Sequence, residues 1–317
     1  MPKIVIADPI FSRIEHWDCG PEWFGAPYEV VWPKGYSFDE MKPYLPGAEG
    51  IVTCFDPFTA EMMDVCGPSL KVVAKPGAGY NNIDVAAATK RGVMACNAEG
   101  VRGRAVAEYA FFHMLWLSRN GWLKGKPEWE TTPMLQLGGK VIGIVGLGDI
   151  GGHLARMADG FGMKVLVNTR TPDPSRVPGV ALEFCSFDEL LPQVDYLVLC
   201  VPLNSETQGM INYGAISKMR KEAFLINMAR GSVVVTDDIL ASAREGLISG
   251  FGLDVIDPEP FPLDHPLRKF NNVLISPHHA SRTRETDAAA LERTAENIRL
   301  ALAGERPINL VNPAVFG

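Results

Sequence analysis

Short apolar runs alternate with helix-period segments along most of the chain, and the alternation is interrupted once, between residues 100 and 140. Before the interruption, the apolar runs have the length of β-strands, and the segments between them have helical spacing. The expected strands are Lys3–Ala7, Tyr28–Trp32, Gly50–Val52, Val72–Ala74 and Val93–Cys96, with a helix over Asp84–Arg91. Because consecutive parallel strands are usually joined by a helix, this order predicts βαβ units and a parallel sheet.

A long apolar helix is expected over Val106–Leu117, and the alternation restarts at Val141. The second half predicts strands at Val141–Val145, Val165–Val167, Tyr196–Val201, Phe224–Asn227, Gly250–Asp254 and Val273–Ile275. Expected helices are Ile150–Phe161, Phe187–Leu191, Asp237–Glu245 and, at the end of the chain, Glu285–Ala303. Six parallel strands are the number in a complete dinucleotide-binding sheet, so the pattern predicts an α/β fold with two Rossmann-like domains.

A glycine-rich turn joins the first strand of the second half to its helix. Gly146, Gly148 and Gly151 have GxGxxG spacing. In dinucleotide-binding folds the first glycine makes a tight turn, the second lets a diphosphate approach the backbone, and the third lets the helix pack close to the strand. A plain strand-to-helix turn can also be rich in glycine. The strand before and the helix after are what the dinucleotide motif requires, so we expect a coenzyme site here.

The domain organisation follows from the order of the elements. A chain that builds one α/β unit, then a second, and ends with a helix often returns that helix to the first unit. We therefore expect a dinucleotide-binding domain over residues 101–284. It would be inserted into a discontinuous, flavodoxin-like substrate-binding domain made of residues 1–100 and 285–317.

Charge and composition exclude several partners. The 317 residues are 47% hydrophobic and 21% charged, with a net charge of −7, which argues against nucleic acid or an anionic membrane as a main partner. No apolar run approaches the roughly 18 residues that cross a bilayer, and the N-terminus lacks the apolar core of a signal peptide. The six cysteines are scattered without a CxxC pair. We expect a cytoplasmic protein with reduced, buried thiols and no metal site.

The residues after the second strand of the coenzyme domain bear on which coenzyme is bound. NAD enzymes usually place an acidic side chain there to hold the ribose hydroxyls. This chain has Thr169 and Arg170, and Asp173 comes only after a proline. Arg170 carries a permanent charge suited to a 2′-phosphate, although a loop arginine can also simply face solvent. We expect NADP(H) to be favoured, with NAD(H) possible.

Three further residues stand near the ends of successive strands: Arg230, Glu259 and His278. An arginine suits a substrate carboxylate and its neighbouring carbonyl, and a histidine can give a proton to the carbonyl oxygen as hydride arrives at carbon. A carboxylate beside the histidine would favour its protonated form and fix its tautomer. Each residue alone has a structural explanation, but their order at the carboxyl edge of a sheet favours a joint site.

A second glycine-rich turn follows the expected strand Val72–Ala74. Its exposed amides at Ala78 and Gly79 could hold a small carboxylate, since successive backbone N–H groups form anion sites. A plain turn between strand and helix explains the same residues, and the stretch by itself leaves both interpretations open.

Several segments together resemble the D-2-hydroxyacid dehydrogenase family. INMARGSVV, GLDVIDPEP and ISPHHAS are similar to its three signature segments. KVVAKPGAGYNNIDVAAATKRGV resembles the family's substrate-side turn, and AVAEYAF its interdomain helix. VPLNSETQGMIN and GERPINLVNP match as well, so the resemblance covers nearly the whole chain from Leu70 onward.

The resemblance implies an oxidoreductase with the nicotinamide in a cleft between two domains and, commonly, a homodimer formed through the coenzyme domain. It implies that Arg230 clamps a 2-oxo acid, that His278 is the acid/base with Glu259 as its partner, and that Ala78 and Gly79 hold the carboxylate. Asp149 and Ile150 amides would meet the diphosphate, and Asp254 the nicotinamide carboxamide. Residues that would line the coenzyme are Val201, Pro202, Thr207, Met228, Ala229 and Ala280. Phe55 would belong to the substrate pocket.

Departures from the family pattern narrow the function. Thr169 in place of the ribose-binding acid resembles the NADP-preferring glyoxylate and hydroxypyruvate reductases. Arg102 stands where asparagine is frequent, and His279 where a small or aliphatic residue is common. An NAD(H)-responsive corepressor of the same fold is an alternative of another class, which oxidation of NADPH by glyoxylate or hydroxypyruvate would exclude. Phosphoglycerate dehydrogenase and formate dehydrogenase are alternatives within the family, and Glu259 argues against the latter because glutamine is typical there.

Overall fold

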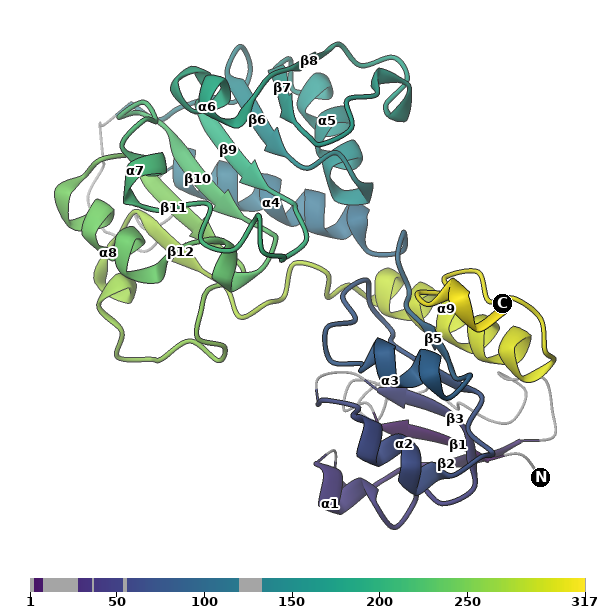
Figure 1. The fold of residues 1–317 in the computed structure, drawn as a ribbon. Coiled ribbons are helices and arrows are strands. Elements are labelled where there is room, and N and C mark those ends of the chain that lie inside the picture. Colours follow the sequence, from purple (N-terminus) through teal and green to yellow (C-terminus); the bar gives the residue numbers. More distant parts are fainter. Residues whose placement is uncertain (1–2, 8–27, 36, 54–55, 120–132, 317) are drawn as a thin grey trace. The chain divides into compact units, whose positions relative to one another are not determined.

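The computed structural model describes residues 3–7, 28–35, 37–53, 56–119 and 133–316, and the chain forms two units (Figure 1). One unit contains Met1–Arg102 and Thr283–Gly317, and the other contains Gly103–Arg282. Each unit is built on its own sheet, and every strand pairing in both sheets is parallel. The predicted α/β fold with two parallel sheets is confirmed.

The first unit has a five-stranded sheet in the order β2-β1-β3-β4-β5, the order of flavodoxin-like folds. Its strands are β1 (Lys3–Ala7), β2 (Glu29–Val31), β3 (Ala48–Thr53), β4 (Val72–Ala74) and β5 (Met94–Cys96). Val5 and Ala7 pack in one apolar cluster, and Ile4 and Ile6 in another. Because both faces of β1 are buried, its sequence reads as a continuous apolar run rather than an alternating one.

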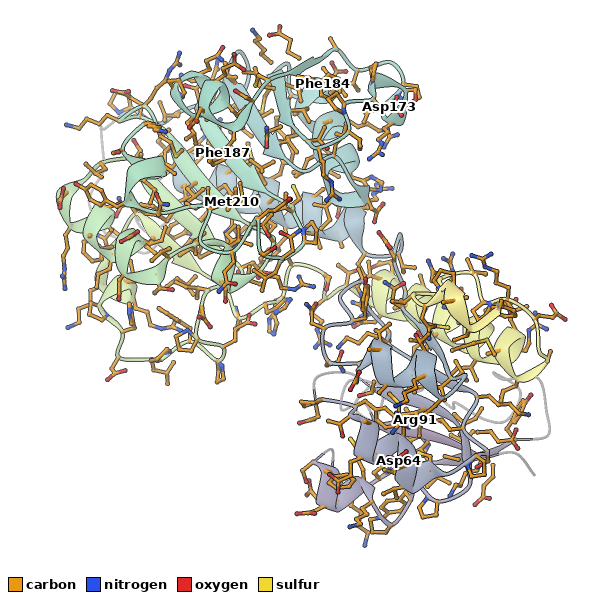
Figure 2. All side chains as sticks on the ribbon, in the orientation of Figure 1. Asp64, Arg91, Asp173, Phe184, Phe187 and Met210 are labelled. Carbon is orange, nitrogen blue, oxygen red and sulfur yellow. The ribbon has the colours of Figure 1, made fainter. Side chains whose placement is uncertain are left out.

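Helices cover both faces of this sheet. The cluster around Val5 receives side chains from α1 (Phe38–Met41), α2 (Ala60–Cys66) and α3 (Val85–Lys90). The cluster around Ile4 receives them from α9 (Arg284–Leu302), which follows the second unit in the sequence. Arg91 and Asp64 join the ends of α3 and α2 by two hydrogen bonds of 2.8 and 2.9 Å (Figure 2).

The second unit has a seven-stranded sheet in the order β12-β11-β10-β9-β6-β7-β8. Its strands are β6 (Val141–Val145), β7 (Lys164–Asn168), β8 (Leu182–Phe184), β9 (Tyr196–Leu199), β10 (Phe224–Asn227), β11 (Gly250–Leu253) and β12 (Val273–Ile275). The chain builds outward from β6 to β8 and then returns to place β9 on the other side of β6. In open parallel sheets such a reversal point lies at the ligand site, at the carboxyl ends of the strands.

Two layers of helices enclose the second sheet (Figure 1). The helices α4 (Gly103–Ser118) and α5 (Asp149–Gly160) share one apolar cluster with β6, β7, β9 and β10. The helices α6 (Phe187–Leu190), α7 (Tyr213–Ile216) and α8 (Thr236–Glu245) share the other. Short 3₁₀ turns are η4 (Pro174–Arg176), η5 (Leu191–Gln193), η6 (Gly231–Val233), η7 (Pro266–Lys269) and η8 (Pro313–Phe316).

The expectation of six strands in the second half was wrong, because β8 is a seventh. This strand is three residues long and pairs only with β7, at the edge of the sheet. Its central residue, Glu183, is exposed, and Leu182 and Phe184 are half-buried. An edge strand of this kind lacks the continuous apolar run that identifies a central parallel strand.

Candidate active site

The turn between β6 and α5 requires glycine at two positions and leaves space at a third. Gly146 has a φ of +100°, and a Cβ there would lie 2.9 Å from the carbonyl oxygen of Cys200. A Cβ on Gly151 would lie 2.1 Å from the carbonyl oxygen of Gly146, so glycine lets α5 start directly against β6. A Cβ on Gly148 would meet no atom within 4 Å. The space over Gly148 is open to a ligand, as the approach of a diphosphate requires.

The first residues of α5 follow this turn, with Gly148 as the N-cap. The amides of Asp149 and Ile150 lie in the first turn, where a helix offers no internal acceptor. The Asp149 carboxylate is turned to the start of α4, because its Oδ2 accepts a hydrogen bond of 3.0 Å from the Gly103 amide. Backbone amides, together with the helix dipole, are therefore the groups at this position that suit an anion.

The loop after β9 runs beside the glycine turn. It begins with Cys200 and Val201, and Val201 Cγ1 would lie 3.1 Å from a Cβ on Gly146. Thr207 closes the loop, since its Oγ1 donates to the carbonyl of Pro202 at 2.7 Å and accepts from the Asn204 amide at 2.9 Å. Of the other predicted lining residues, Met228 and Ala229 are buried after β10.

Thr169 and Arg170 follow β7 and differ in exposure. Thr169 is half-buried and Arg170 is exposed, and the structure shows no hydrogen bond or ion pair of Arg170 with any described residue. The nearby acid, Asp173, is hydrogen-bonded to Ser175. It accepts hydrogen bonds from the hydroxyl and amide of Ser175 at 2.6 and 2.9 Å, and these bonds lower the pKa of Asp173. Asp173 thus caps a 3₁₀ turn instead of standing at the strand end.

A second guanidinium, which the sequence analysis missed, stands beside the glycine turn. Arg176 Nη1 donates to the carbonyl of Leu147 at 3.1 Å, and its Nη2 donates to Thr171 Oγ1 at 3.4 Å. Arg176 is the last residue of a 3₁₀ turn that was not predicted, so its position relative to Leu147 could not be read from spacing. The one available signal was a second basic residue in the loop that carries Arg170.

Arg230 follows β10 on a backbone that a buried amide holds in place. Asn227 Nδ2 donates to the carbonyls of Arg230 and Val255, each at 3.1 Å, and its Oδ1 accepts from the Ala229 amide at 3.1 Å. The guanidinium donates to the Ala229 carbonyl at 2.7 Å. Burial lowers the pKa of Arg230, and the charge of Glu259 acts in the opposite direction. Arg230 therefore lies within electrostatic reach of Glu259.

His278 and Glu259 form an ion pair at the same edge of the sheet. His278 Nδ1 lies 3.0 Å from Glu259 Oε1, and each side chain keeps nearly half of its exposure, 44% and 46%. A pair this exposed adds little to stability, at most about 1 kcal/mol. Its effect is orientation: with Nδ1 facing Glu259, Nε2 is the ring nitrogen left for another partner. The structure thus pairs His278 with Glu259, whose charge also acts on Arg230 in the same unit.

The turn that carries His278 is strained, and the buried Asp254 carboxylate holds it by hydrogen bonds. His278 has a φ of +55°, a left-handed conformation that costs an ordinary residue roughly 1–2 kcal/mol. Asp254, which is 2% exposed, accepts from the Ser276 hydroxyl at 2.7 Å and from the amides of His279 and Ala280 at 2.9 and 3.0 Å. The His278 amide also donates to the Asp254 carbonyl at 2.8 Å. These bonds fix the backbone on both sides of His278.

In the first unit, the turn over residues 76–79 is bound through its carbonyl oxygens. Arg102 Nη2 donates to the Pro76 carbonyl at 3.1 Å, and Asn97 Nδ2 donates to the Ala78 carbonyl at 2.7 Å. No hydrogen bond with a described residue uses the amides of Ala78 or Gly79. The turn therefore presents its N–H groups unused, as an anion site would.

The two departures from the family pattern occupy defined positions. Arg102 pairs with Asp287 at 3.0 Å, and their side chains are 15% and 18% exposed, so in this unit Arg102 braces the turn and the start of α9. The His279 side chain is exposed, and the His279 amide donates a hydrogen bond to the Asp254 carboxylate. Phe55, predicted to line the substrate pocket, lies outside the described residues.

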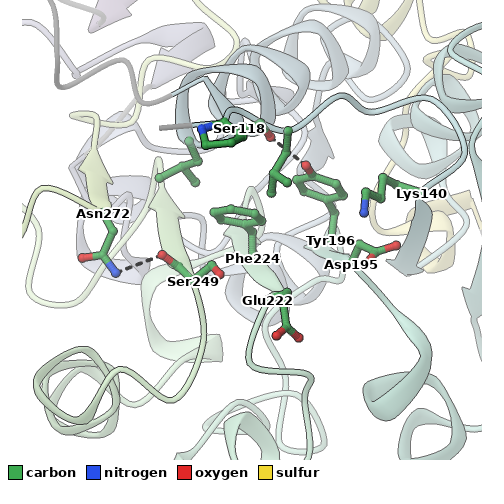
Figure 3. A pocket seen from close by; sticks show the side chains of 11 residues that line it. Ser118, Lys140, Asp195, Tyr196, Glu222, Phe224, Ser249 and Asn272 are labelled. Carbon is green, nitrogen blue, oxygen red and sulfur yellow. Dashed lines mark hydrogen bonds between the residues drawn. The ribbon is translucent and has the colours of Figure 1, made fainter. Parts of the chain in front are cut away.

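A cavity of about 400 Å³ lies at the amino ends of the strands of the second sheet, opposite to the carboxyl ends where His278 and Glu259 lie (Figure 3). Lys140, Asp195, Phe224 and Asn272 line it, all at or just before the amino ends of strands. None of the predicted site residues lies in its wall. Since ligands of open parallel sheets bind at the carboxyl ends, this cavity is not the expected coenzyme site.

In the ranges that the structure describes, no cluster of His, Cys, Asp or Glu has the arrangement of a metal site. Within the same ranges, every helix is too short or too polar to cross a membrane.

Comparison with known proteins identifies the family. Residues 113–280 match the family model of the D-isomer specific 2-hydroxyacid dehydrogenase NAD-binding domain. The glyoxylate reductase of Korarchaeum cryptofilum is 40% identical over 276 residues, which cover 82% of this chain and 81% of that protein. The chain belongs to the D-isomer specific 2-hydroxyacid dehydrogenase family. The resemblance found in the sequence is confirmed.

Relatives of nearly full length agree with this assignment. The glyoxylate reductase of Thermococcus kodakarensis is 36% identical over 333 aligned positions, covering 99% of this chain and 97% of that protein. The structure of an NADPH-dependent glyoxylate/hydroxypyruvate reductase from Sinorhizobium meliloti superposes with a TM-score of 0.83 at 26% identity, covering 99% of both chains. Membership of this family makes the protein an oxidoreductase that acts on CH–OH donors and transfers hydride between a nicotinamide coenzyme and a 2-oxo or 2-hydroxy acid.

Proposed function

We propose that this 2-hydroxyacid dehydrogenase reduces a small 2-oxo acid such as glyoxylate or hydroxypyruvate, with NADPH as the favoured coenzyme. The observation that supports the reaction most strongly is the 3.0 Å pairing of His278 with Glu259, within electrostatic reach of Arg230. An imidazole held by a carboxylate, next to a guanidinium, combines a proton donor with a binding group for a 2-oxo acid.

The three side chains divide the chemical work. Arg230 binds the substrate and draws electron density toward the carbonyl oxygen, because its guanidinium stays charged at any physiological pH. Glu259 holds His278 Nδ1, so that a proton on Nε2 faces the substrate. In reduction, hydride forms a C–H bond at C2 as the carbonyl π bond breaks, and the oxygen takes the Nε2 proton. The product is the 2-hydroxy acid, and His278 is left neutral.

The glycine turn fits a nicotinamide dinucleotide. The bound coenzyme supplies the hydride. We assign its diphosphate to the amides of Asp149 and Ile150, over the open side of Gly148. Asp254 Oδ2 accepts only the Ala280 amide among the described residues, so one acceptor position of this oxygen suits a carboxamide. Gly146, Gly151, Val201, Pro202, Thr207, Met228, Ala229 and Ala280 would complete the lining.

Two guanidinium groups and a missing acid favour NADPH. No carboxylate stands directly at the end of β7, where it would repel a 2′-phosphate; Asp173, later in the same loop, lies 3.9 Å from Arg176 Nε. Arg170 extends from that position, and Arg176 is held beside the glycine turn at the Leu147 carbonyl. Both offer charged, fork-shaped donors that match a phosphate. We also assign the substrate carboxylate to the amides of Ala78 and Gly79, because the described residues hydrogen-bond their turn through its carbonyl oxygens and leave these two N–H groups unused.

A panel assay tests the proposal. Glyoxylate, hydroxypyruvate, pyruvate and a bulkier 2-oxo acid are each supplied with NADPH and with NADH, and the loss of absorbance at 340 nm is followed. We expect kcat/KM to be highest for the two small acids and at least about tenfold higher with NADPH, which corresponds to about 1.4 kcal/mol. A preference for NADH would overturn the assignment of Arg170 and Arg176, and no turnover of any 2-oxo acid would overturn the proposed reaction.

We further propose a homodimer formed through the coenzyme domain, in the cytoplasm. Light scattering of the purified protein decides the first point, because a monomeric mass of 34.6 kDa at micromolar concentration would refute it.

A further inference from the structure

A buried histidine that the proposed chemistry does not use lies directly behind the catalytic turn. His113 is on α4 and has no exposed surface. Its Nε2 lies 3.1 Å from Ser276 Oγ, while Nδ1 has no hydrogen-bond partner among the described residues. Tyr109 and Phe112 of the same helix lie against the ring, with centroids 5.1 and 5.8 Å away. A polar ring in this setting needs a reason beyond filling space.

Hydrogen-bond arithmetic fixes the direction of the contact. A hydroxyl has one proton, and that of Ser276 goes to Asp254 Oδ1 at 2.7 Å, since a carboxylate can only accept. Ser276 Oγ must therefore accept from His113, so the proton of the ring is on Nε2. Burial lowers the pKa of His113 to about 4, against the opposing charge of Asp254, and the ring is neutral at physiological pH. The bare Nδ1 then faces β11, where a Cβ on Gly252 would lie 2.7 Å from it.

We propose that His113 is a positioning residue for His278: it donates Nε2–H to Ser276, which commits the Ser276 hydroxyl to Asp254 and thereby holds the turn that carries the catalytic ring. The chain of hydrogen bonds runs from His113 on α4 to Ser276, which directly follows β12, and from Ser276 to the Asp254 carboxylate after β11. That carboxylate then binds the amides of His279 and Ala280. The inference rests on the proposed role of His278, which His113 does not touch.

Without this donor the Ser276 hydroxyl can rotate more freely. Its hydrogen bond to Asp254 is then formed for a smaller fraction of the time. The strained backbone at His278 then loses one of the contacts that hold it. The diphosphate site at the glycine turn does not depend on this chain, and Asp254 Oδ2, the oxygen that we assign to the carboxamide, keeps its bond to the Ala280 amide. Loss of the donor should therefore lower kcat and leave the dissociation constant of the coenzyme unchanged.

The test compares H113Q, which keeps an N–H donor near the position of Nε2, with H113M, which fills similar space without one. M114L, a buried substitution of conserved volume on the same helix, is the matched control. We expect kcat of H113M to fall at least about tenfold with KM and coenzyme affinity within about threefold. H113Q should retain at least about a third of wild-type kcat, and M114L should behave as wild type. Equal losses in H113M and H113Q would show a packing role and overturn the proposal.

Hydrogen exchange gives a readout that does not need turnover. The peptide covering residues 276–282 should exchange faster in H113M than in wild type, H113Q or M114L. S276A removes the central hydroxyl and should give the same faster exchange, so the proposal stays testable if H113M fails to fold. Unchanged exchange in S276A and H113M would refute the positioning role. Absence of 2-oxo acid reduction by the wild type would instead refute the proposed function, and the two failures are thus distinguishable.

Discussion

Two alanine substitutions in the same glycine turn should have opposite effects, and the contrast tests where the coenzyme binds. A Cβ at residue 148 meets no atom within 4 Å, and the backbone there has a φ of −89° and a ψ of −154°, which alanine adopts readily. G148A should therefore fold normally. Its unfolding free energy should stay within about 1 kcal/mol of the wild type, because the roughly 0.4–1 kcal/mol gained from the lower freedom of alanine in the unfolded chain is offset by the poorer N-cap that alanine makes.

The same methyl group would stand where we place the diphosphate. It would separate the phosphate oxygens from the amides of Asp149 and Ile150, and a hydrogen bond to a charged group contributes about 1.5–3 kcal/mol. Loss of one such bond raises the coenzyme dissociation constant by roughly one to two powers of ten.

G151A should instead destabilise the fold. The new Cβ would lie 2.1 Å from the Gly146 carbonyl oxygen, and reaching an ordinary contact of 3.4 Å requires α5 to move away from β6. Overpacking of this kind costs about 1–3 kcal/mol, more than the roughly 1 kcal/mol that alanine gains over glycine inside a helix.

Urea unfolding of the coenzyme-free proteins and fluorescence titration with NADPH separate these effects. We expect G148A to stay close to the wild-type urea midpoint with weakened coenzyme binding, and G151A to lose stability before any coenzyme is added. Wild-type NADPH affinity in G148A would show that the diphosphate does not pass over residue 148. A wild-type urea midpoint for G151A would show that the contact with Gly146 is not as close as described.

Three further predictions concern the catalytic pair, the coenzyme and acid stability. H278A should lower kcat by at least about 100-fold, the usual range for loss of a general acid, with NADPH affinity unchanged by fluorescence titration; near-normal turnover would remove His278 from its role. T169D should shift the kcat/KM ratio toward NADH by about tenfold or more, since a carboxylate repels a 2′-phosphate, and an unchanged ratio would place the phosphate elsewhere. Acid should destabilise the wild type through His113, whose pKa is lowered to about 4 in the fold and is near 6.5 when unfolded. The neutral ring contributes fully above pH 6.5 and progressively less down to pH 4, so lowering the pH from 7 to 5 should cost about 2 kcal/mol of unfolding free energy that H113M does not lose.

The sequence was sufficient to predict an element where a single continuous stretch determines its type and its bounds. The apolar run Val141–Val145 became β6 with the predicted bounds, and the glycines after it occupy the positions that the motif requires. Both faces of such a strand are buried, so its composition alone identifies it. β8 was missed for the converse reason, because an edge strand with exposed Glu183 has no such run.

The sequence also predicted that Arg230, Glu259 and His278 converge, because the carboxyl ends of parallel strands meet at one edge, and the 3.0 Å pairing of His278 with Glu259 agrees with that reasoning. It could not predict the residues beneath them. The bond from His113 to Ser276 joins positions 163 residues apart, and no local pattern reports such a distance. The sequence did hold one signal. A histidine within the apolar run Ala110–Leu117 is expected to be buried together with its helix, and a buried ring nitrogen needs a hydrogen-bond partner.

The arrangement beneath the site explains how half-exposed side chains can be held in place. At the ends of β10 and β11 stand buried polar residues whose side chains bind the backbone that follows the next strand. Asn227, the last residue of β10, binds the Val255 carbonyl after β11, and Asp254 after β11 binds the amides of His279 and Ala280 after β12. Because each anchor is removed from water, its hydrogen bonds have no solvent competitor and are costly to break. The reactive groups can then remain accessible to substrate while the anchors fix their backbones, so we expect substitutions at Asn227 and Asp254 to impair catalysis without removing any group that reacts.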